Sequence, residues 1–275
     1  MMRWLLLLLL LLSSSSWACE LKMGYRTTQR PPFIAGAPDN TGLYKELYET
    51  AATKMGCKLT IVRSSKSRIL AKIDTGDIDF YPGLTPTPER AQYVHFFPNG
   101  LVDGYMGISH LDLAEITHYG QLSGKTLLIA KGGPRLVSDD LNVIIKEPPE
   151  LSVAMAAEMI DQKKADFYIY NFTSLIEFIK QNKDLNIKLH RHCCGEFQPM
   201  QLGFYLKSAK IKTKPNETLN TRYPHNNQQL DDQSTARLLK ETLAEMAQDG
   251  TTAGIFYKHF NHPMPQMAAL NKQAD

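Results

Sequence analysis

The sequence has little cysteine, no marked excess of either charge and few long apolar runs. Four cysteines in 275 residues are too few for a domain built on a disulfide scaffold. Thirty-one Lys and Arg against 28 Asp and Glu leave a formal net charge of +3, which argues against a nucleic-acid or polyanion binder. A mean hydropathy of −0.29 excludes a polytopic membrane protein. With 43% hydrophobic and 21% charged residues, the composition is that of a globular protein rather than a disordered chain or a coiled coil.

The one long apolar run lies at the start of the chain. Arg3 precedes apolar residues at 4–12, and mostly small residues follow at 13–18. A membrane-spanning helix needs about twenty apolar residues, roughly twice this run. The pattern predicts a secretory signal peptide over residues 1–18, cleaved after Ala18, and therefore an exported product; an uncleaved membrane anchor is the alternative. The remaining chain is long enough for one large domain or two small ones.

Cys19 has two interpretations. Cleavage would make it the first residue, where a lipoprotein carries its lipid, but Ser16 stands where a lipoprotein signal usually has leucine. Cys19 also precedes the apolar segment 21–25, and Cys57 precedes the apolar segment 59–62. If these segments are neighbouring parallel strands, both cysteines lie at one end of the sheet, within reach of a disulfide. A Cys19–Cys57 disulfide is therefore favoured, with lipidation of Cys19 as the minor alternative.

Apolar spacing predicts alternating strands and helices. Apolar residues recur every four positions from Leu43 to Met55 and Gly56 follows, which predicts a helix over residues 41–55. The other elements expected before residue 90 are strands at 21–25, 58–62 and 78–81 and a helix at 67–75. A second series comprises strands at 126–130, 142–145, 167–170, 187–190 and 202–206 and helices at 149–162, 174–180, 235–248 and 252–260. The β-α-β-α-β order of the first series predicts a parallel sheet with right-handed crossovers, and the two series together predict an α/β fold.

One arginine stands where a helix start would not favour it. Thr87 is a candidate N-cap, and Pro88 suits the first helical position. Arg90 then lies in the first turn, where the helix dipole disfavours a cation. A bound anion explains that placement better than the electrostatics of the helix do; a solvated arginine on a short turn is the alternative.

Several blocks of sequence, taken in order, resemble one family. They are Leu-Lys-Met-Gly at 21–24 with Pro-Pro-Phe at 31–33, Gly-Leu at 42–43, Lys-Met-Gly at 54–56, Gly-Asp-Ile-Asp at 76–79, the segment 83–90, and Gln-Asp-Gly-Thr at 248–251. The order and spacing of these blocks resemble the bacterial extracellular solute-binding proteins of family 3, the periplasmic amino-acid receptors of ABC importers. The resemblance covers nearly all of the chain after residue 18.

The resemblance implies an architecture and a class of ligand. It implies a two-lobed periplasmic-binding-protein (Venus-flytrap) fold with a cleft between the lobes. Residues 19–103 and 204–275 would form lobe one, and residues 104–203 would form lobe two. A small molecule would bind in the cleft and close the lobes around it. A monomer is expected, without cofactor or metal.

The resemblance also assigns roles to individual residues. Arg90 corresponds to the family's carboxylate-binding arginine, which suits bidentate recognition and agrees with its placement at the helix start. Thr85 corresponds to the hydroxyl that accompanies this arginine. Gly83 would let the backbone approach the ligand.

Other positions depart from the family and change the expected ligand. Asn171 stands where relatives carry an acidic partner for the ligand's amino group, and Gly132 lacks the hydroxyl residues that usually follow it. Arg30 replaces a common aromatic residue. Losing an acid and gaining Arg30, with Lys131 and Arg135 nearby in sequence, points toward a more anionic ligand. The alternative is that these three cations are solvated surface charges.

Three functions are compatible with this sequence. The first is a binding protein that delivers a carboxylate-bearing solute, an amino acid or a related acid, to an ABC permease. The second is a ligand sensor that signals to a membrane partner. The third is an enzyme, because some relatives of this fold are cyclohexadienyl dehydratases, but that chemistry needs a general acid near Arg90 and Asn171 occupies the expected acidic position. A binding protein without catalysis is the prediction.

The cluster around residues 190–194 suggests two further kinds of site. His190, His192, Cys193 and Cys194 are metal-ligating residue types, but zinc sites usually draw their ligands from two separate segments. No metal site is therefore expected. Cys193 and Cys194 can form a vicinal disulfide or stay reduced, and the sequence leaves both open.

Overall fold

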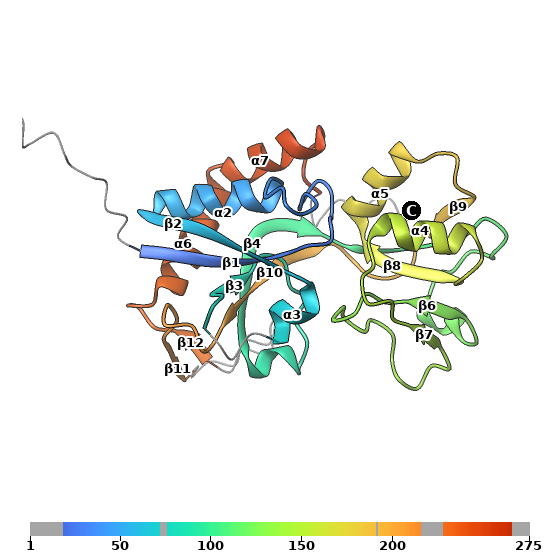
Figure 1. Cartoon of the computed structure of the whole chain (residues 1–275), viewed down its shortest axis with the longest axis horizontal. Coiled ribbons are helices and arrows are strands. Elements are labelled where there is room, and N and C mark those ends of the chain that lie inside the picture. The colour runs from blue at the N-terminus through green and yellow to red at the C-terminus, as the bar shows by residue number, and fades with distance from the viewer. Residues whose placement is uncertain (1–18, 72–75, 191, 216–227, 266–275) are drawn as a thin grey trace, which may run out of the picture.

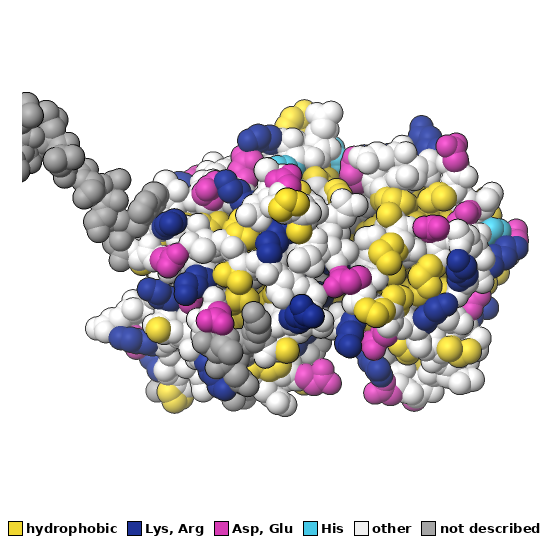
Figure 2. Space-filling view, in the orientation of Figure 1, with side chains coloured by type: hydrophobic (Ala, Val, Ile, Leu, Met, Phe, Trp, Pro, Cys, Tyr) yellow, Lys and Arg dark blue, Asp and Glu magenta, His cyan; other side chains and the backbone are white. Residues whose placement is uncertain are grey.

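The computed structural model describes residues 19–71, 76–190, 192–215 and 228–265 (Figure 1). The expected signal peptide lies outside these residues. Two five-stranded sheets lie at opposite ends of an elongated molecule, each with helices packed against it. None of the helices in the described ranges is long and apolar enough to cross a membrane. Positive and negative side chains are interspersed over the face in Figure 2, in keeping with the small net charge.

The first sheet has the order β2-β1-β3-β10-β4. Its strands are β1 (Cys19–Arg26), β2 (Cys57–Ser64), β3 (Phe80–Tyr81), β4 (Val94–Asp103) and β10 (Gln198–Tyr205). Its helices are α2 (Leu43–Lys54), α3 (Lys66–Ala71), α6 (Thr235–Gln248) and α7 (Thr251–Phe260), with the short η3 (Arg90–Gln92) before β4. We call this unit lobe one. β1 runs parallel to β2 and β3, whereas β10 is antiparallel to β3 and β4.

The core of lobe one follows the apolar spacing of its helices. Leu43, Leu47 and Ala51 of α2 are fully buried, as the four-residue spacing predicts for one helix face. They pack with α6, α7 and the first face of the sheet. A second apolar cluster holds Ile69 of α3 and Phe96 of β4 on the other side of the sheet. Both faces of the sheet are therefore covered, as expected for parallel strands.

The second sheet has the order β7-β6-β8-β5-β9. Its strands are β5 (Tyr105–His110), β6 (Thr126–Leu128), β7 (Ile144–Lys146), β8 (Phe167–Asn171) and β9 (Ile187–His190), and its helices are α4 (Val153–Asp161) and α5 (Phe172–Gln181). We call this unit lobe two. Ser152 caps α4 by accepting a hydrogen bond from the Met155 N–H at 3.1 Å. The remaining short elements are η4 (Tyr119–Leu122) and the hairpin strands β11 (Thr213–Pro215) and β12 (Gln228–Leu230).

The chain passes between the sheets twice. It leaves the first sheet after Asp103 and enters the second at Tyr105, and it returns between His190 and Gln198. The two crossings touch, because a Cβ atom on Gly104 would lie 3.2 Å from the Glu196 carbonyl oxygen. β10 pairs with β4 from Gln198 onward, so the expected lobe boundary at residues 203 and 204 falls inside a strand of the first sheet.

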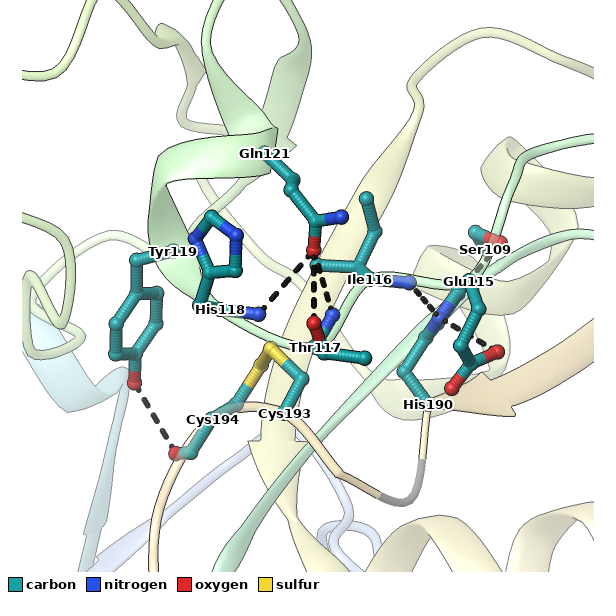
Figure 3. Close-up of a disulfide and its surroundings, with 10 residues drawn as sticks. All are labelled: Ser109, Glu115, Ile116, Thr117, His118, Tyr119, Gln121, His190, Cys193 and Cys194. Carbon is teal, nitrogen blue, oxygen red and sulfur yellow. Dashed lines mark hydrogen bonds and ion pairs between the residues drawn. A yellow bond between two sulfur atoms is a disulfide. The ribbon is translucent and has the colours of Figure 1, made fainter.

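Two disulfides account for all four cysteines. Cys19 and Cys57 are bonded at the start of β1 and β2, where they are register partners with Cα atoms 4.6 Å apart. Cys193 and Cys194 form a vicinal disulfide within the return crossing (Figure 3). Cys194 has a φ of 86°, and both cysteines are buried against the apolar cluster that includes Phe167. The Tyr119 hydroxyl donates a hydrogen bond to the Cys194 carbonyl oxygen at 3.1 Å.

His190 has a structural place beside this disulfide. Its Nδ1 accepts a hydrogen bond from the Ile116 N–H at 2.9 Å, and its Nε2 lies 2.8 Å from the Ser109 hydroxyl (Figure 3). Burial lowers the pKa of His190 in spite of the nearby Glu115 carboxylate. Among the described residues, no group of three or more His, Cys, Asp or Glu is placed to hold a metal ion.

Acid is expected to destabilise lobe one through His95. This side chain is buried in β4, and burial, with the charge of Lys240, lowers its pKa from 6.5 to about 4. Because the folded pKa lies below the unfolded one, folding favours the neutral ring. The resulting stability is complete above about pH 6.5 and is lost as the pH falls toward 4, by up to about 3 kcal/mol. Urea unfolding between pH 7 and pH 4 measures the loss of stability. In the His95→Gln variant, the free energy of unfolding should fall less steeply as the pH is lowered. Equal slopes in the two proteins would contradict the assignment.

Candidate functional site

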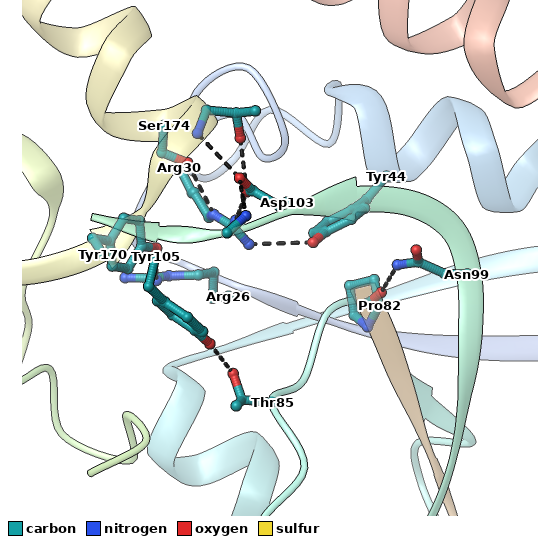
Figure 4. Close-up of polar contacts among 12 residues, drawn as sticks. Arg26, Arg30, Tyr44, Pro82, Thr85, Asn99, Asp103, Tyr105, Tyr170 and Ser174 are labelled. Carbon is teal, nitrogen blue, oxygen red and sulfur yellow. Dashed lines mark hydrogen bonds and ion pairs between the residues drawn. The ribbon is translucent and has the colours of Figure 1, made fainter. Parts of the chain in front are cut away.

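Charged and aromatic side chains gather where the two lobes meet (Figure 4). β1 and β2 end at this side of the first sheet, because parallel strands place their carboxyl ends at one edge. The loop between β3 and η3 adds further polar residues from lobe one. Lobe two contributes the loop after β6, the segment before α4, and the junction of β8 with α5. Hydrogen bonds cross between the lobes at each of these places.

Arg90 links the lobes. It begins η3 and is 5% exposed. Its Nη1 donates to the Thr85 carbonyl oxygen at 2.6 Å, and its Nη2 donates to the Gly132 carbonyl oxygen at 2.7 Å, in lobe two. Thr87 accepts a hydrogen bond from the Arg90 N–H at 3.2 Å, in the capping position expected from the sequence. Three residues predicted for the site, Arg90, Thr85 and Gly132, therefore come together, and burial lowers the pKa of Arg90.

Thr85 and Gly83 occupy different surroundings. The Thr85 hydroxyl shares a hydrogen bond with the Tyr105 hydroxyl of lobe two (Figure 4). A Cβ atom on Gly83 would lie 2.1 Å from the Tyr44 hydroxyl oxygen, so that any larger residue would displace Tyr44. The close approach at Gly83 is thus made to a side chain of lobe one. Asn171, the other predicted residue of lobe two, ends β8 and is the register partner of Tyr105.

Arg30 lies in a second cluster near the two crossings, together with Tyr44, Asp103 and Ser174. It is 7% exposed; its Nε donates to the Ser174 hydroxyl at 3.3 Å and its Nη1 donates to the Tyr44 hydroxyl at 3.2 Å (Figure 4). Its Nη2 lies 3.8 Å from the Asp103 carboxylate. The guanidinium carbon also sits 4.2 Å from the centre of the Phe33 ring, a cation–π distance. The structure therefore engages Arg30 with protein groups from both lobes.

Asp103 is a central residue that the sequence reasoning missed. Its carboxylate accepts hydrogen bonds from the Gly104 N–H at 2.9 Å, the Thr173 N–H at 3.2 Å and the Thr173 hydroxyl at 2.7 Å. Burial raises the pKa of Asp103, while Arg30 and Thr173 act to lower it. The residue joins the outgoing crossing, the start of α5 and Arg30. Its position beside Gly104, in the stretch expected to cross between lobes, was the available signal.

Two further cations were also missed. Arg26 ends β1 and is 6% exposed; its Nη2 donates to the Leu151 carbonyl oxygen at 3.2 Å, in lobe two. Lys66 begins α3 and is half-buried. Burial and the charges of Arg90, Arg26 and Arg30 hold the pKa of Lys66 well below its usual value. The signal for both was their place directly after parallel strands.

A small pocket opens beside these cations. It encloses roughly 230 Å³ of empty space, open solvent included, and is lined by Arg26, Lys66, Ser67, Ala130, Lys131, Pro149, Glu150 and Leu151. Of the extra cations expected near the ligand, the exposed Lys131 lies at this pocket, whereas Arg135 is 3.8 Å from Asp139 on the surface. The lining comes from both lobes, so an occupant would touch both.

Comparison with known proteins gives a consistent result. The sequence profile of the bacterial extracellular solute-binding proteins, family 3, matches residues 21–262. No curated protein matches the chain. An ancestral arginine-binding protein bound to arginine is similar in structure, with a TM-score of 0.66, 20% identity, and coverage of 89% of this chain and 100% of that one. An amino acid ABC transporter substrate-binding protein from Streptococcus pneumoniae, bound to L-arginine, has a TM-score of 0.65, 16% identity, and coverage of 90% and 97%.

A sensor domain has the same fold. The histidine kinase sensor domain with similarity to periplasmic binding proteins has a TM-score of 0.69 and 15% identity, and the match covers 90% of this chain and 98% of that one. At these identities the solved structures show a shared two-lobed fold.

Proposed function

The chain belongs to the bacterial extracellular solute-binding proteins of family 3, and on that premise we propose that it binds a small carboxylate-bearing solute, an amino acid or a related acid, in the cleft between its lobes. The observation that carries the proposal is the buried Arg90, whose guanidinium reaches the backbone of both lobes. Family membership implies a periplasmic or extracellular location. The proposed place is the periplasm, after removal of residues 1–18, and the proposed role is delivery of the solute to an ABC permease.

The geometry suggests how binding would close the cleft. Arg90 belongs to lobe one, and its Nη2 donates to the Gly132 carbonyl of lobe two. A solute carboxylate bound to Arg90 would place an acceptor at the same seam, while groups of lobe two contact the rest of the solute. Ligand binding would then favour the closed arrangement by its extra affinity for it. The closed shape is the signal that a permease would recognise, and a single copy of the chain is sufficient to form it.

The arrangement of acids supports binding without catalysis. Asp103, the buried acid of this region, accepts hydrogen bonds from Gly104 and Thr173 and lies near Arg30. These contacts already engage the Asp103 carboxyl with protein groups. The other acid at the pocket, Glu150, is exposed and accepts a hydrogen bond from the Thr28 hydroxyl. We therefore assign neither residue a role as a general acid.

Arg90→Ala is expected to weaken solute binding by roughly a hundredfold or more, because it removes a buried, charge-assisted donor to the carboxylate. The protein is first unfolded and refolded to remove any bound solute. A thermal-shift panel of amino acids, dicarboxylates, keto acids and small peptides then identifies a binder, since a ligand at a hundred times its Kd adds about 2.7 kcal/mol of stability. Isothermal titration compares the variant with wild type.

Arg135→Ala is the matched control, because Arg135 is an exposed arginine paired with Asp139 beyond the Gly132 loop. Its affinity should equal that of wild type. Full affinity in a folded Arg90→Ala protein would overturn the assignment of the carboxylate site.

A membrane sensor is the second candidate partner, and the likeness in fold to a histidine kinase sensor domain is its support. Cells lacking the chain separate the two roles. Loss of uptake of the labelled solute supports delivery to a permease. Intact uptake, with loss of the transcriptional response to the solute, supports sensing.

A further inference from the structure

The cleft gathers more positive charge than its carboxylates offset. Arg26, Lys66 and Arg90 belong to three separate segments of lobe one. Besides burial, the charges of Arg90 and Arg26 lower the pKa of Lys66. The exposed Lys131 of lobe two lies at the same pocket. Burying cations near one another is costly unless an anion accompanies them. The solute is therefore the candidate source of the negative charge that would balance these cations.

Arg26 is buried without a carboxylate partner. Its Nη2 donates to the Leu151 carbonyl oxygen at 3.2 Å, and its Nη1 lies 3.5 Å from the Tyr170 hydroxyl, at the limit of a hydrogen bond. Its Nε is buried and unpartnered. Both groups that it contacts are neutral. Arg26 is 6% exposed and lines the pocket, so a full positive charge with unused hydrogen-bonding capacity lies beside this space.

Lys66 faces cations instead of acids. The charges that lower its pKa, after burial itself, are those of Arg90, Arg26 and Arg30. It begins α3 and lines the pocket together with Arg26. An ammonium group in such surroundings is stabilised by whatever anion enters the pocket.

The two nearby acids are already engaged. Asp103 is held by Gly104 and Thr173 and lies 3.8 Å from Arg30, in the second cluster near the two crossings. Glu150 lies on the exposed rim of the pocket, where it accepts a hydrogen bond from Thr28. Among the described residues that line the pocket, Glu150 is thus the carboxylate that remains to balance the charges of Arg26, Lys66, Arg90 and Lys131.

We propose that Arg26 and Lys66 form a second anion-binding subsite, distinct from Arg90, and that the solute is a small dicarboxylic acid. The inference rests on the proposed function, since Arg90 would hold the first carboxylate. The second carboxylate would enter the pocket and accept hydrogen bonds from the Lys66 ammonium and the free Nε of Arg26. Such an acid bridges the lobes and supplies the charge that the protein lacks there.

Proton uptake gives this subsite its own signature. The groups that face Lys66 are Arg26 of β1, Arg30 of the loop after it, Arg90 of η3, and Lys131 and Glu150 of lobe two. In the free protein burial and the surrounding cations lower the pKa of Lys66, whereas a bound carboxylate would raise it. Binding of a diacid therefore takes up a proton, and its affinity falls as the pH rises.

Isosteric pairs test the second carboxylate. Titration calorimetry compares glutamate with glutamine and succinate with succinamate, which differ only in one acidic group. Each titration is run in HEPES and in Tris, whose different heats of ionisation reveal proton uptake. We expect at least one diacid to bind ten times more tightly than its amide, with a fraction of a proton taken up.

Lys66→Met tests the residue. It keeps the length of the side chain and removes its charge, so it should reduce the preference for the diacid at least threefold and abolish proton uptake. Affinity for the amide should fall less than affinity for the diacid. Arg68→Met is the matched control, because Arg68 is an exposed cation on the same helix. It should leave both measurements at the wild-type value.

The outcomes separate the two proposals. If acids bind through Arg90 but diacids have no advantage, or if Lys66→Met leaves the preference intact, the second subsite is overturned and the proposed function stands. If no carboxylic acid binds the refolded protein, the proposed function is overturned and the subsite with it.

Discussion

Asp103→Ala is expected to lower the free energy of unfolding by about 3–5 kcal/mol. The carboxylate accepts hydrogen bonds from Gly104 and Thr173, and it is the acid nearest to the buried Arg30. Removing it strands a guanidinium that is 7% exposed, together with the N–H and hydroxyl of Thr173. Breaking a buried ion pair from one side carries a penalty of this size, because the remaining charge cannot regain its water.

Urea unfolding monitored by circular dichroism measures the effect. Asp139→Ala is the matched control, since Asp139 is an acid paired with an arginine but 93% exposed at its side chain; its loss should stay below about 1 kcal/mol. Adding Arg30→Met to Asp103→Ala should recover part of the stability by removing the stranded charge. A loss in Asp103→Ala no greater than that in the control would show that Arg30 does not depend on this carboxylate.

Replacing both Cys19 and Cys57 with serine is expected to lower the free energy of unfolding of the oxidised protein by about 4 kcal/mol. The bridge closes a loop with a sequence separation of 38 residues, and the loop-entropy relation gives this value. Solute binding should be nearly unchanged. β1 starts at Cys19 and ends at Arg26, so the bridge and the cleft lie at opposite ends of the strand.

Reduction provides the control for this variant. A dithiol reductant should destabilise the wild type strongly and the Cys19→Ser/Cys57→Ser variant much less, because only the vicinal Cys193–Cys194 bridge remains. Equal melting temperatures in oxidised wild type and variant, with free thiols detected in the wild type, would contradict the Cys19–Cys57 bridge. The same result would return weight to lipidation of Cys19.

Local patterns predicted the helices and parallel strands well, but they missed β4 and β5, strands whose pairing is antiparallel. The four-residue spacing located α2 within two residues at its start and one at its end. β4, ten residues long, was not predicted as a strand. It contains Pro98, Asn99 and Gly100, which together read as a turn.

Long-range pairing explains why β4 nevertheless forms. The register with β10 shifts between Pro199 and Gln201, opposite Pro98, which accommodates the irregularity. The fully buried Asn99 then donates to the Pro82 carbonyl oxygen at 3.0 Å and accepts from the Leu101 N–H at 3.0 Å. The pairing with β10 and the contact with Pro82, unlike the contact with Leu101, lie outside a local window of sequence.

The candidate site also contains residues that a local motif could predict and contacts that form only in the folded structure. Thr85 and Arg90 are five residues apart, so a motif could place them together. Arg26 meets Leu151 and Asp103 meets Thr173 only after both lobes have folded. Arg30 was expected at the ligand because of the residue it replaces, yet its contacts are with Asp103, Tyr44 and Ser174. The chemical type of a side chain could be used for prediction, whereas the residue that it contacts in the other lobe could not be predicted.

The two disulfides lie in different parts of the fold, one in lobe one and one in the return crossing. Cys19–Cys57 ties two strands of a single sheet, and Cys193–Cys194 ties neighbours in sequence, so neither connects one lobe to the other. Oxidation can therefore stiffen lobe one and the return crossing without a covalent tie between the lobes. An exported receptor with this covalent layout can gain resistance to unfolding while its amplitude of opening stays under the control of hydrogen bonds that a solute can replace.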